Sequence, residues 1–516
     1  MITENRKSSY IFPLMCINTN PHTQNQNQAL RSMPLTVLIF IHVTLLLLFI
    51  FFRLIDGDEG IFLRAGQLVQ AGQVPYFDFF YMQMPYLPYL LAPISTWGFT
   101  SLFLARILVA GLSLASVFMI YKMAVRAGAN RNISLLLYFL LIANGLFLTW
   151  QTTVKTQVLS DFFGIASFFF FLPIIFTGHP RKNLKLSLFV TGILVGIAIN
   201  IRSIQVLLLC SELILIGVFL PKGSQKIQTS AMMLLGVLIA STGSLALFIQ
   251  DPSLFWLHNV SLHQQWGSEI VNQSTTIKLM TIAKFILFPQ TIILLIPVFF
   301  TLRRAVRTPV IEWSDTDRLG MSAILVATLF ALFYSTILEP VQLQYFEQTV
   351  PFLVLGGLAG WGGIINSEIW RHWKIPILSI YVAGLSPFIM VFLLNYRDND
   401  ASNSLKTART VIRIIEQTCS PGDTILSANT ALPQFAKRPI VKGMEVDGRQ
   451  LLKIVDPEKR NQIQLMDSLT FVNLGRSGRY TIVLFDTTQF PDLSAQLGER
   501  YELRGKASSI RIWREK

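Results

Sequence analysis

Residues 34–54 read PLTVLIFIHVTLLLLFIFFRL, and this stretch decides the fold class. An α-helix needs about 20 consecutive apolar residues to cross the roughly 30 Å hydrocarbon core of a bilayer. The stretch is long enough, and its only charged residue, Arg53, stands near its far end. It therefore predicts a helix that spans a membrane.

Further apolar stretches repeat this pattern along most of the chain. With the first, they predict about eleven spanning helices, at 34–54, 101–121, 132–150, 161–177, 186–201, 203–220, 228–249, 290–302, 319–338, 351–366 and 376–394. The region 186–220 is also compatible with one bent span, and 290–302 is short. Composition agrees, because 52% of the residues are hydrophobic and only 14% are charged, against about 25% charged in soluble domains.

The distribution of Lys and Arg predicts how the helices are oriented. These residues gather in cytoplasmic loops, and here they are frequent in every second connecting segment, for example at Lys122, Arg126, Arg303 and Arg304. We therefore expect a multi-pass protein of the plasma (inner) membrane with a cytoplasmic N-terminus. The net charge of +14 then largely reflects topology, and no nucleic-acid partner is needed to explain it.

Three regions follow from the composition. Residues 1–33, rich in Asn and Gln, predict a disordered cytoplasmic tail, and translation could also start at Met33. Residues 34–394 form the membrane domain. Residues 395–516 read as a small soluble α/β domain, which an odd number of spans places outside the cytoplasm; one miscounted span would reverse that side.

The C-terminal domain has recognisable elements but no catalytic pattern. Helical periodicity at 404–417 and apolar runs at 424–427, 480–485 and 510–513 predict one helix and three strands. Neither a glycine-rich phosphate loop nor a catalytic cluster is present in its sequence. Binding of an acceptor or partner, and a stabilising cap over the outer face, both remain open.

The long loop after the first span, residues 55–100, carries the strongest chemical signal. Asp56, Asp58 and Glu59 follow directly on the helix. Crowded carboxylates at a membrane boundary raise one another's pKa, as a general base requires. A solvated acidic loop is the competing interpretation.

From this loop onward the chain resembles the C-class integral-membrane glycosyltransferases, in the branch with protein O-mannosyltransferases, the lipid A aminoarabinose transferase and lipopolysaccharide galacturonosyltransferases. The resemblance covers about 34–366. It rests on an ordered set of motifs: Asp58-Glu59-Gly60, Ala65-Gly66, Gly72, Pro75-Tyr76, Asp78-Phe79, Pro85, Leu104–Leu108, Gly192–Ala198 followed by Arg202, and Tyr345–Gln348 before Pro351.

The resemblance implies an inverting transfer from a polyprenyl-phosphate sugar to a hydroxyl of a lipid, glycan or protein. We expect Asp58 to be the base, with Glu59 orienting it or binding the acceptor, and Lys155 and Arg202 to hold the phosphate. Lys155 could instead be an interfacial lysine. Other expected substrate-binding residues are Asp56, Asp78, Tyr81, Asp161, His263, Tyr345 and Glu347.

Some of these positions have competing interpretations. Asp161 could be an ordinary N-cap, His263 an interfacial histidine, and Tyr81 part of an aromatic belt. The resemblance leaves a divalent metal open, but Gln83-Met84-Pro85 lacks the metal-capable residue expected there. No cofactor is otherwise implied.

Two other functions remain open. A transporter or flippase of lipid-linked glycans would explain the helices, but it gives no reason for acids on one outer loop, and no inverted repeat is apparent. A polysaccharide polymerase or ligase usually carries its large loop between late helices, whereas here the long acidic loop comes first.

Overall fold

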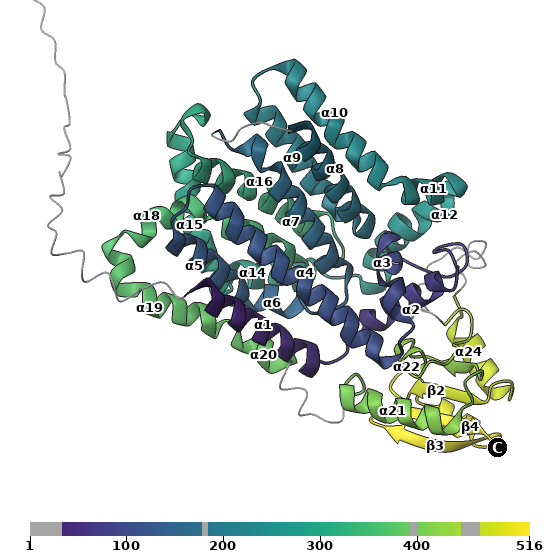
Figure 1. Ribbon diagram of the computed structural model, residues 1–516. Helices are drawn as coiled ribbons and strands as arrows, with labels where there is room; N and C mark the ends of the chain where they lie inside the picture. The colour runs from purple at the N-terminus through teal and green to yellow at the C-terminus, as the bar shows by residue number, and fades with distance from the viewer. Residues whose placement is uncertain (1–33, 178–183, 393–400, 445–451, 453–464) are drawn as a thin grey trace, which may run out of the picture.

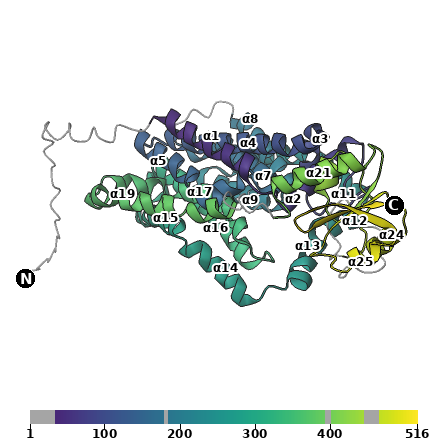
Figure 2. The same ribbon diagram turned by 90° about the horizontal axis from the view of Figure 1, so that it is seen from below.

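The computed structural model describes residues 34–177, 184–392, 401–444, 452 and 465–516, so the tail predicted at 1–33 lies outside it. Figure 1 shows a bundle of long helices with a small mixed α/β domain at one end. Figure 2, turned by 90°, places that domain at the same end. The predicted fold class, a helical membrane domain with a small α/β domain, is thus observed.

Seven helices are long and apolar enough to cross a membrane, or up to nine if each of two bent pairs is one span, within the described residues. The seven are α1 (Leu35–Phe52), α4 (Phe99–Arg126), α7 (Thr156–Ile175), α8 (Leu184–Ile201), α15 (Pro289–Arg307), α16 (Asp315–Thr336) and α19 (Glu368–Ala383) continued by α20 (Ser386–Phe392).

The bent pairs and two shorter apolar helices fill the remaining predicted spans. One pair is α10 (Gly223–Ala240) with α11 (Thr242–Gln250), bent by 61°, and the other joins η7 (Leu343–Thr349) and α17 (Val350–Gly356) to α18 (Leu358–Ile365), bent by 52°. The shorter helices are α5 (Arg131–Ile142), which α6 (Gly145–Trp150) follows, and η3 (Ser203–Gln205) with α9 (Val206–Phe219). Within the described residues, which end at 392 in the last of them, each predicted stretch falls mainly on helix, but the count of eleven is not confirmed.

Small residues let some of these helices approach closely. A Cβ added to Gly192 on α8 would lie 1.9 Å from the carbonyl oxygen of Met233 on α10, and Gly236 faces the same contact from the other side. Helices in lipid lack a hydrophobic drive to associate and use such small-residue contacts instead. This packing holds α8, and with it the turn that carries Arg202, in a fixed place.

The region outside the spans contains more helix than the sequence predicted. The first loop folds into α2 (Gly57–Gln70) and α3 (Tyr86–Ser95). A later segment contains α12 (Pro252–Trp256), α13 (Leu262–Gln265) and α14 (Thr275–Leu287), with π-helical turns at Leu257–Ser261 and Trp266–Val271. A short 3₁₀ turn, Val310–Glu312, precedes α16.

The C-terminal domain is a four-stranded mixed sheet with helices against it. Its order is β1-β2-β4-β3, in which β1 (Ile425–Ser427) and β2 (Ile482–Asp486) are parallel, and β4 (Ile510–Glu515) runs antiparallel to both β2 and β3 (Tyr501–Ala507). The helices are α21 (Leu405–Thr418), α22 (Ala431–Phe435), α24 (Ser468–Arg476) and α25 (Leu493–Leu497). The predicted helix and three strands are found; β3 was not predicted.

The domain docks directly on the loop 55–100. The amide of Ile55 donates to the Asn403 carbonyl at 2.9 Å, and the Asn403 side chain donates back to the Ile55 carbonyl at 3.1 Å. A Cβ on Gly60 of α2 would lie only 2.4 Å from the Cβ of Ala431 on α22. The loop 55–100 and the C-terminal domain therefore lie at the same end of the helices.

Candidate active site

The acidic motif forms the beginning of α2. The Asp56 carboxylate caps the helix by accepting from the Asp58 amide at 3.0 Å, and the Glu59 carboxylate accepts from the Asp56 amide at 2.9 Å. Asp and Glu three residues apart are a common helix start, because each satisfies a backbone N–H that the helix leaves unpaired. The motif therefore fixes the three acids relative to one another.

The three carboxylates differ sharply in their access to solvent. The side chain of Asp58 is 49% exposed, that of Asp56 20% and that of Glu59 0%. A general base must reach the proton that it removes. Asp58 is the acid whose position best meets that requirement.

Lys155 lies against the two more exposed acids. It stands just before α7, and its Nζ is 3.1 Å from Asp56 Oδ1 and 3.0 Å from Asp58 Oδ2. Its ammonium also lies 4.8 Å from the centre of the Trp150 ring. Burial lowers the pKa of Lys155, but the charges of Asp58 and Asp56 outweigh burial and raise it above its ordinary value. Lys155 is thus held as a cation beside the candidate base.

Glu59 occupies a different environment. Its Oε1 and Oε2 accept from Arg106 Nε at 2.8 Å and Nη2 at 2.6 Å, and both side chains are fully buried. The Val154 amide also points at Oε1, at 3.3 Å. With its carboxylate buried against Arg106, Glu59 is not placed to orient Asp58 or to bind the acceptor, the roles expected of it. These contacts favour a structural ion pair that joins α2 to α4.

A second polar cluster gathers Arg202 with two buried acids. Asp161 on α7 and Glu347 in η7 lie close enough for their charges to interact with Arg202, in the turn after α8. Amide side chains hold the acids: Gln205 donates to Asp161 at 3.1 Å, Gln348 also donates to Asp161, and Gln151 donates to Glu347. The fold thus unites three of the expected substrate-binding residues from distant segments.

The contacts of this cluster leave one donor of the Arg202 guanidinium unpaired among the described residues. The guanidinium lies 5.3 Å from the centre of the Tyr345 ring, and its buried Nη1 has no hydrogen-bond partner among the described residues. A buried N–H without a partner is costly. Arg202 is therefore a cation with a donor left for an anionic ligand.

Tyr345 connects the two clusters. Its hydroxyl lies close enough to interact electrostatically with Arg202, Lys155 and Asp58. The acid–lysine pair and the arginine therefore both lie near Tyr345.

His263 and Tyr81 also approach this site. His263, on α13, is near the charge of Arg202 and contacts the backbone of Met82, and burial lowers its pKa. The Tyr81 hydroxyl is buried, lies within electrostatic reach of Asp58, and has no hydrogen-bond partner among the described residues. Burial raises the pKa of Tyr81 well above its ordinary value, so it would act as a hydrogen-bond donor.

Asp78 lies elsewhere. It is exposed, accepts from the Val74 amide at 2.7 Å within its own turn, and lines a separate cavity of about 380 Å³ together with Arg64 and Lys442. The structure therefore does not place Asp78 with the other expected substrate-binding residues.

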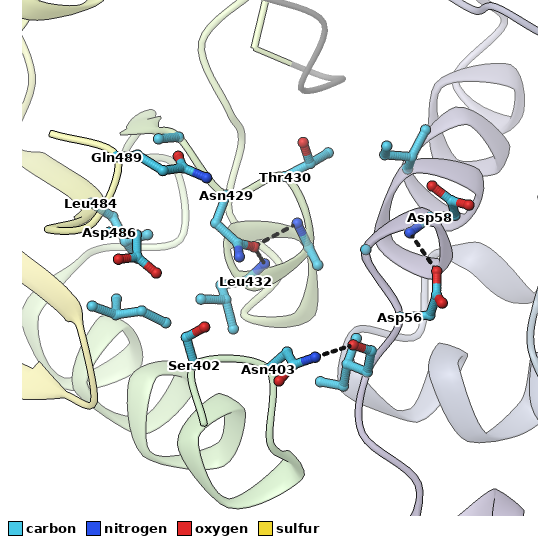
Figure 3. A pocket seen from close by; sticks show the side chains of 16 residues that line it. Asp56, Asp58, Ser402, Asn403, Asn429, Thr430, Leu432, Leu484, Asp486 and Gln489 are labelled. Carbon is cyan, nitrogen blue, oxygen red and sulfur yellow. Dashed lines mark hydrogen bonds between the residues drawn. The ribbon is translucent and has the colours of Figure 1, made fainter. Parts of the chain in front are cut away.

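A cavity of about 340 Å³ opens beside Asp56 and Asp58, and the C-terminal domain forms its opposite wall. Figure 3 shows Asn429, Thr430, Asp486 and Gln489 facing the two acids across the gap. These residues were not anticipated, because nothing in a sequence links positions about 370 to 430 residues apart. Gln151, Gln205 and Gln348 were missed for a related reason, since amide side chains carry no catalytic signature.

The acids do not form a metal centre. Within the described ranges, no three side chains of His, Cys, Asp or Glu are grouped as metal ligands. The Lys155 ammonium also bridges Asp56 and Asp58, where a metal ion would have to bind. The described residues around Asp56 and Asp58 therefore do not fit a divalent metal.

Comparisons with known proteins agree on the fold. No family model matches the sequence, and no curated protein matches it. Among solved structures, ArnT from Cupriavidus metallidurans bound to undecaprenyl phosphate superposes with a TM-score of 0.67 at 13% identity, covering 93% of this chain and 97% of that one. Its apo form gives 0.66 with the same identity and coverage.

A more distant structure has the same architecture. The apo oligosaccharyltransferase of Archaeoglobus fulgidus matches with a TM-score of 0.50 at 11% identity, over 89% of this chain and 71% of that one. Identities this low establish the fold alone. The chain has the fold of the C-class membrane glycosyltransferases, as the resemblance predicted.

Proposed function

We propose that the protein is an inverting glycosyltransferase that moves a sugar from a polyprenyl-phosphate donor to a hydroxyl acceptor. The observation that carries the proposal is the pairing of a half-exposed carboxylate, Asp58, with Lys155 at 3.0 Å. Near the same Tyr345 lies Arg202, whose buried Nη1 has no partner among the described residues. A base and two phosphate-binding cations are the groups that this reaction needs. The solved structure of the same fold with undecaprenyl phosphate supports a lipid-phosphate donor.

In the proposed step, Asp58 accepts the proton of the acceptor hydroxyl as its oxygen attacks the anomeric carbon. The bond between that carbon and the phosphate oxygen breaks on the opposite face, and its electron pair leaves with the polyprenyl phosphate. Inversion follows from this single displacement. A glycosidase needs a second, protonated carboxyl for its leaving oxygen, whereas a phosphate leaves as an anion and cations can stabilise it.

Lys155 and Arg202 would supply that stabilisation. A lysine ammonium has three N–H donors, and in Lys155 two of them face Asp56 and Asp58. The third is then available to a phosphate oxygen, while Arg202, beside the Tyr345 ring, would offer its Nη1. Asp161 and Glu347 would hold Arg202 in place, and Tyr81 and His263 would line the approach.

We also propose which side of the membrane the site faces. The loop 55–100 and residues 395–516 would face the outside of the plasma (inner) membrane, where a lipid-linked donor presents its sugar. Acceptors that fit the reaction are glycans, lipids or proteins with a free hydroxyl. The bilayer itself would deliver the donor to the site.

Two measurements test the proposal. The purified protein is incubated with radiolabelled polyprenyl-phosphate sugars and membrane extract, and we expect donor-dependent transfer. Lys155→Ala and Arg202→Ala should impair the use of donor more than the use of acceptor.

Binding of undecaprenyl phosphate tests the phosphate assignment without turnover. Arg202→Ala should weaken it about 10–150-fold, because hydrogen bonds to charged groups contribute about 1.5–3 kcal/mol. The matched control is Arg307→Ala, an exposed arginine at the end of α15. Equal binding of undecaprenyl phosphate by both variants would refute the phosphate assignment. If no donor of the panel yields a radiolabelled product and the protein instead moves glycolipid across vesicle membranes, a transporter is favoured.

A further inference from the structure

The cavity between α2 and the C-terminal domain has a chemistry of its own. It is walled by Asp56 and Asp58 on α2 and its cap and by Asp486 at the end of β2, and no Lys or Arg is among its described lining residues. Arg511 interacts with Asp486 electrostatically but does not line the space. Lys155 offsets one charge of the α2 pair. The cavity is therefore net negative.

Uncharged polar groups supply the rest of the polar lining. Asn429 is fixed because its Oδ1 accepts from the amides of Ala431 and Leu432, both at 3.0 Å. Its Nδ2 donates to no described residue and is left for a ligand. Thr430 and Gln489 stand on either side of it (Figure 3). Such groups bind hydroxyls in both directions, as donors and as acceptors.

Aliphatic side chains cover the remaining surface. Ile61 on α2 and Leu484 and Ile510 on the sheet all reach the cavity. A sugar ring presents C–H faces between its hydroxyls, and this mixture of apolar wall and few polar groups matches such a ligand. The volume of about 340 Å³ lies within the range of about 300–1,000 Å³ seen for small-molecule sites.

The wall that carries these groups is held rigidly. Besides the paired hydrogen bonds between Ile55 and Asn403, α22 packs so tightly on α2 that Gly60 leaves no room for a Cβ beside Ala431. The ring of Phe435 on α22 also packs on Phe99 at the start of α4, with centroids 5.4 Å apart. The C-terminal domain is thus a fixed part of the cavity and no loosely attached appendage.

We propose that this cavity binds the acceptor, and that the acceptor presents an uncharged sugar, with the C-terminal domain selecting against phosphate and carboxylate groups. Identifying the ligand of the cavity as the acceptor rests on the proposed function, because Asp58, which lines the cavity, is the proposed base. The selection rests on charge: an anionic group would have to lie among Asp56, Asp58 and Asp486, and like charges set side by side exclude wrong partners.

The test uses the full-length protein in nanodiscs without any donor. Saturation-transfer NMR compares methyl glucoside, methyl galactoside and methyl mannoside with the matched methyl uronides, in which a carboxylate replaces the C6 alcohol. At least one neutral glycoside should bind, and its uronide should bind at least about tenfold more weakly. Failure of all three neutral glycosides to bind, or equal binding of the uronides, overturns the inference.

A variant pair locates the binding and tests the role of charge. Gln489→Lys adds a cation to the exposed wall, and it should narrow or reverse the preference for the neutral sugar. Asn473→Lys is the matched control, because Asn473 is exposed on α24 of the same domain and does not line the cavity. If both variants keep the wild-type preference, the cavity is not the binding site.

The result is separable from the proposed function. A protein that binds neutral glycosides in this way but transfers sugar from no polyprenyl-phosphate donor would keep the cavity assignment and lose the transferase. A protein that transfers sugar efficiently to uronates or phosphorylated glycans would keep the transferase and lose the acceptor assignment.

Discussion

Replacing Glu59 by glutamine separates a structural role from a catalytic one. The Glu59 carboxylate and the Arg106 guanidinium are both fully buried, and two N–H···O contacts of 2.8 and 2.6 Å join them. Arg106 further donates to the carbonyls of Ile50 and Leu54, both at 3.0 Å. Glutamine would leave the arginine charge buried without its counter-ion.

The magnitude follows from the burial. Removing one partner of a buried ion pair destabilises a protein by about 3–5 kcal/mol, because the other charge is left uncompensated. The amide would also turn N–H groups toward donors, since the Asp56 and Val154 amides point at the same oxygens. We therefore expect Glu59→Gln to lower the yield of folded protein and its thermal midpoint. Turnover per folded molecule should fall far less.

The assay measures the thermal midpoint in detergent and the turnover of the monodisperse fraction. The double variant Glu59→Gln/Arg106→Gln should be more stable than the sum of the single variants predicts, by about 0.5–3 kcal/mol, as expected for residues in direct contact. Asp58→Asn is the matched control, because its half-exposed side chain should change stability little. If Glu59→Gln is stable but its turnover is reduced more than about 100-fold, the structural role is refuted and Glu59 takes part in catalysis.

Three further predictions test the surroundings of the site. Gly60→Ala should loosen the C-terminal domain and reduce turnover, because its Cβ would lie 2.4 Å from that of Ala431; Ala431→Gly in the same chain should partly restore both, and no restoration would disprove the contact. Burial lowers the pKa of His258 to about 4, so the unfolded chain, with a histidine pKa of about 6.5, takes up a proton first as the pH falls. The contribution of His258 to the free energy of unfolding should therefore be fully present above about pH 6.5 and should be lost toward pH 4, by up to about 3 kcal/mol. His258→Phe should flatten this decline in thermal melts, and an unchanged dependence on pH would contradict the prediction. A cysteine at the exposed Thr410 of α21 should react with a membrane-impermeant maleimide in intact cells, whereas labelling only after lysis would place this domain in the cytoplasm.

The spanning helices were predictable because hydrocarbon leaves the chain few alternatives. A buried backbone in lipid must satisfy its own hydrogen bonds, so a long apolar stretch such as 35–52 becomes a helix. Helix α21 was predictable in the same way, from apolar residues at helical spacing behind the N-cap Ser404. Helix α2 was missed although its signal was present, since Asp56 and Glu59 have the spacing of a capping box.

Other features depend on tertiary contacts that local patterns do not encode. Strand β3 alternates charged residues such as Glu502, Arg504 and Lys506 along the edge of the sheet, where charges discourage further pairing, and it therefore lacks an apolar run. For the site, the acids of α2 and Lys155 stood out by charge. The partners Gln205 and Gln348 did not, because only the packing of α7 against distant segments gives a neutral amide its role.

The rate of a single turnover in Asp56→Asn and Asp58→Asn, at saturating donor and acceptor, tests the central claim most directly. Asn keeps the shape of the side chain but cannot accept the proton. Loss of a general base typically reduces the rate about 10²–10⁴-fold, so the rate of Asp58→Asn should fall by at least that factor with folding intact. The rate of Asp56→Asn should fall less, because the Asp56 carboxylate caps α2. Near-wild-type turnover in Asp58→Asn, with Asp56→Asn inactive, would move the base to Asp56, and full activity in both would contradict the account.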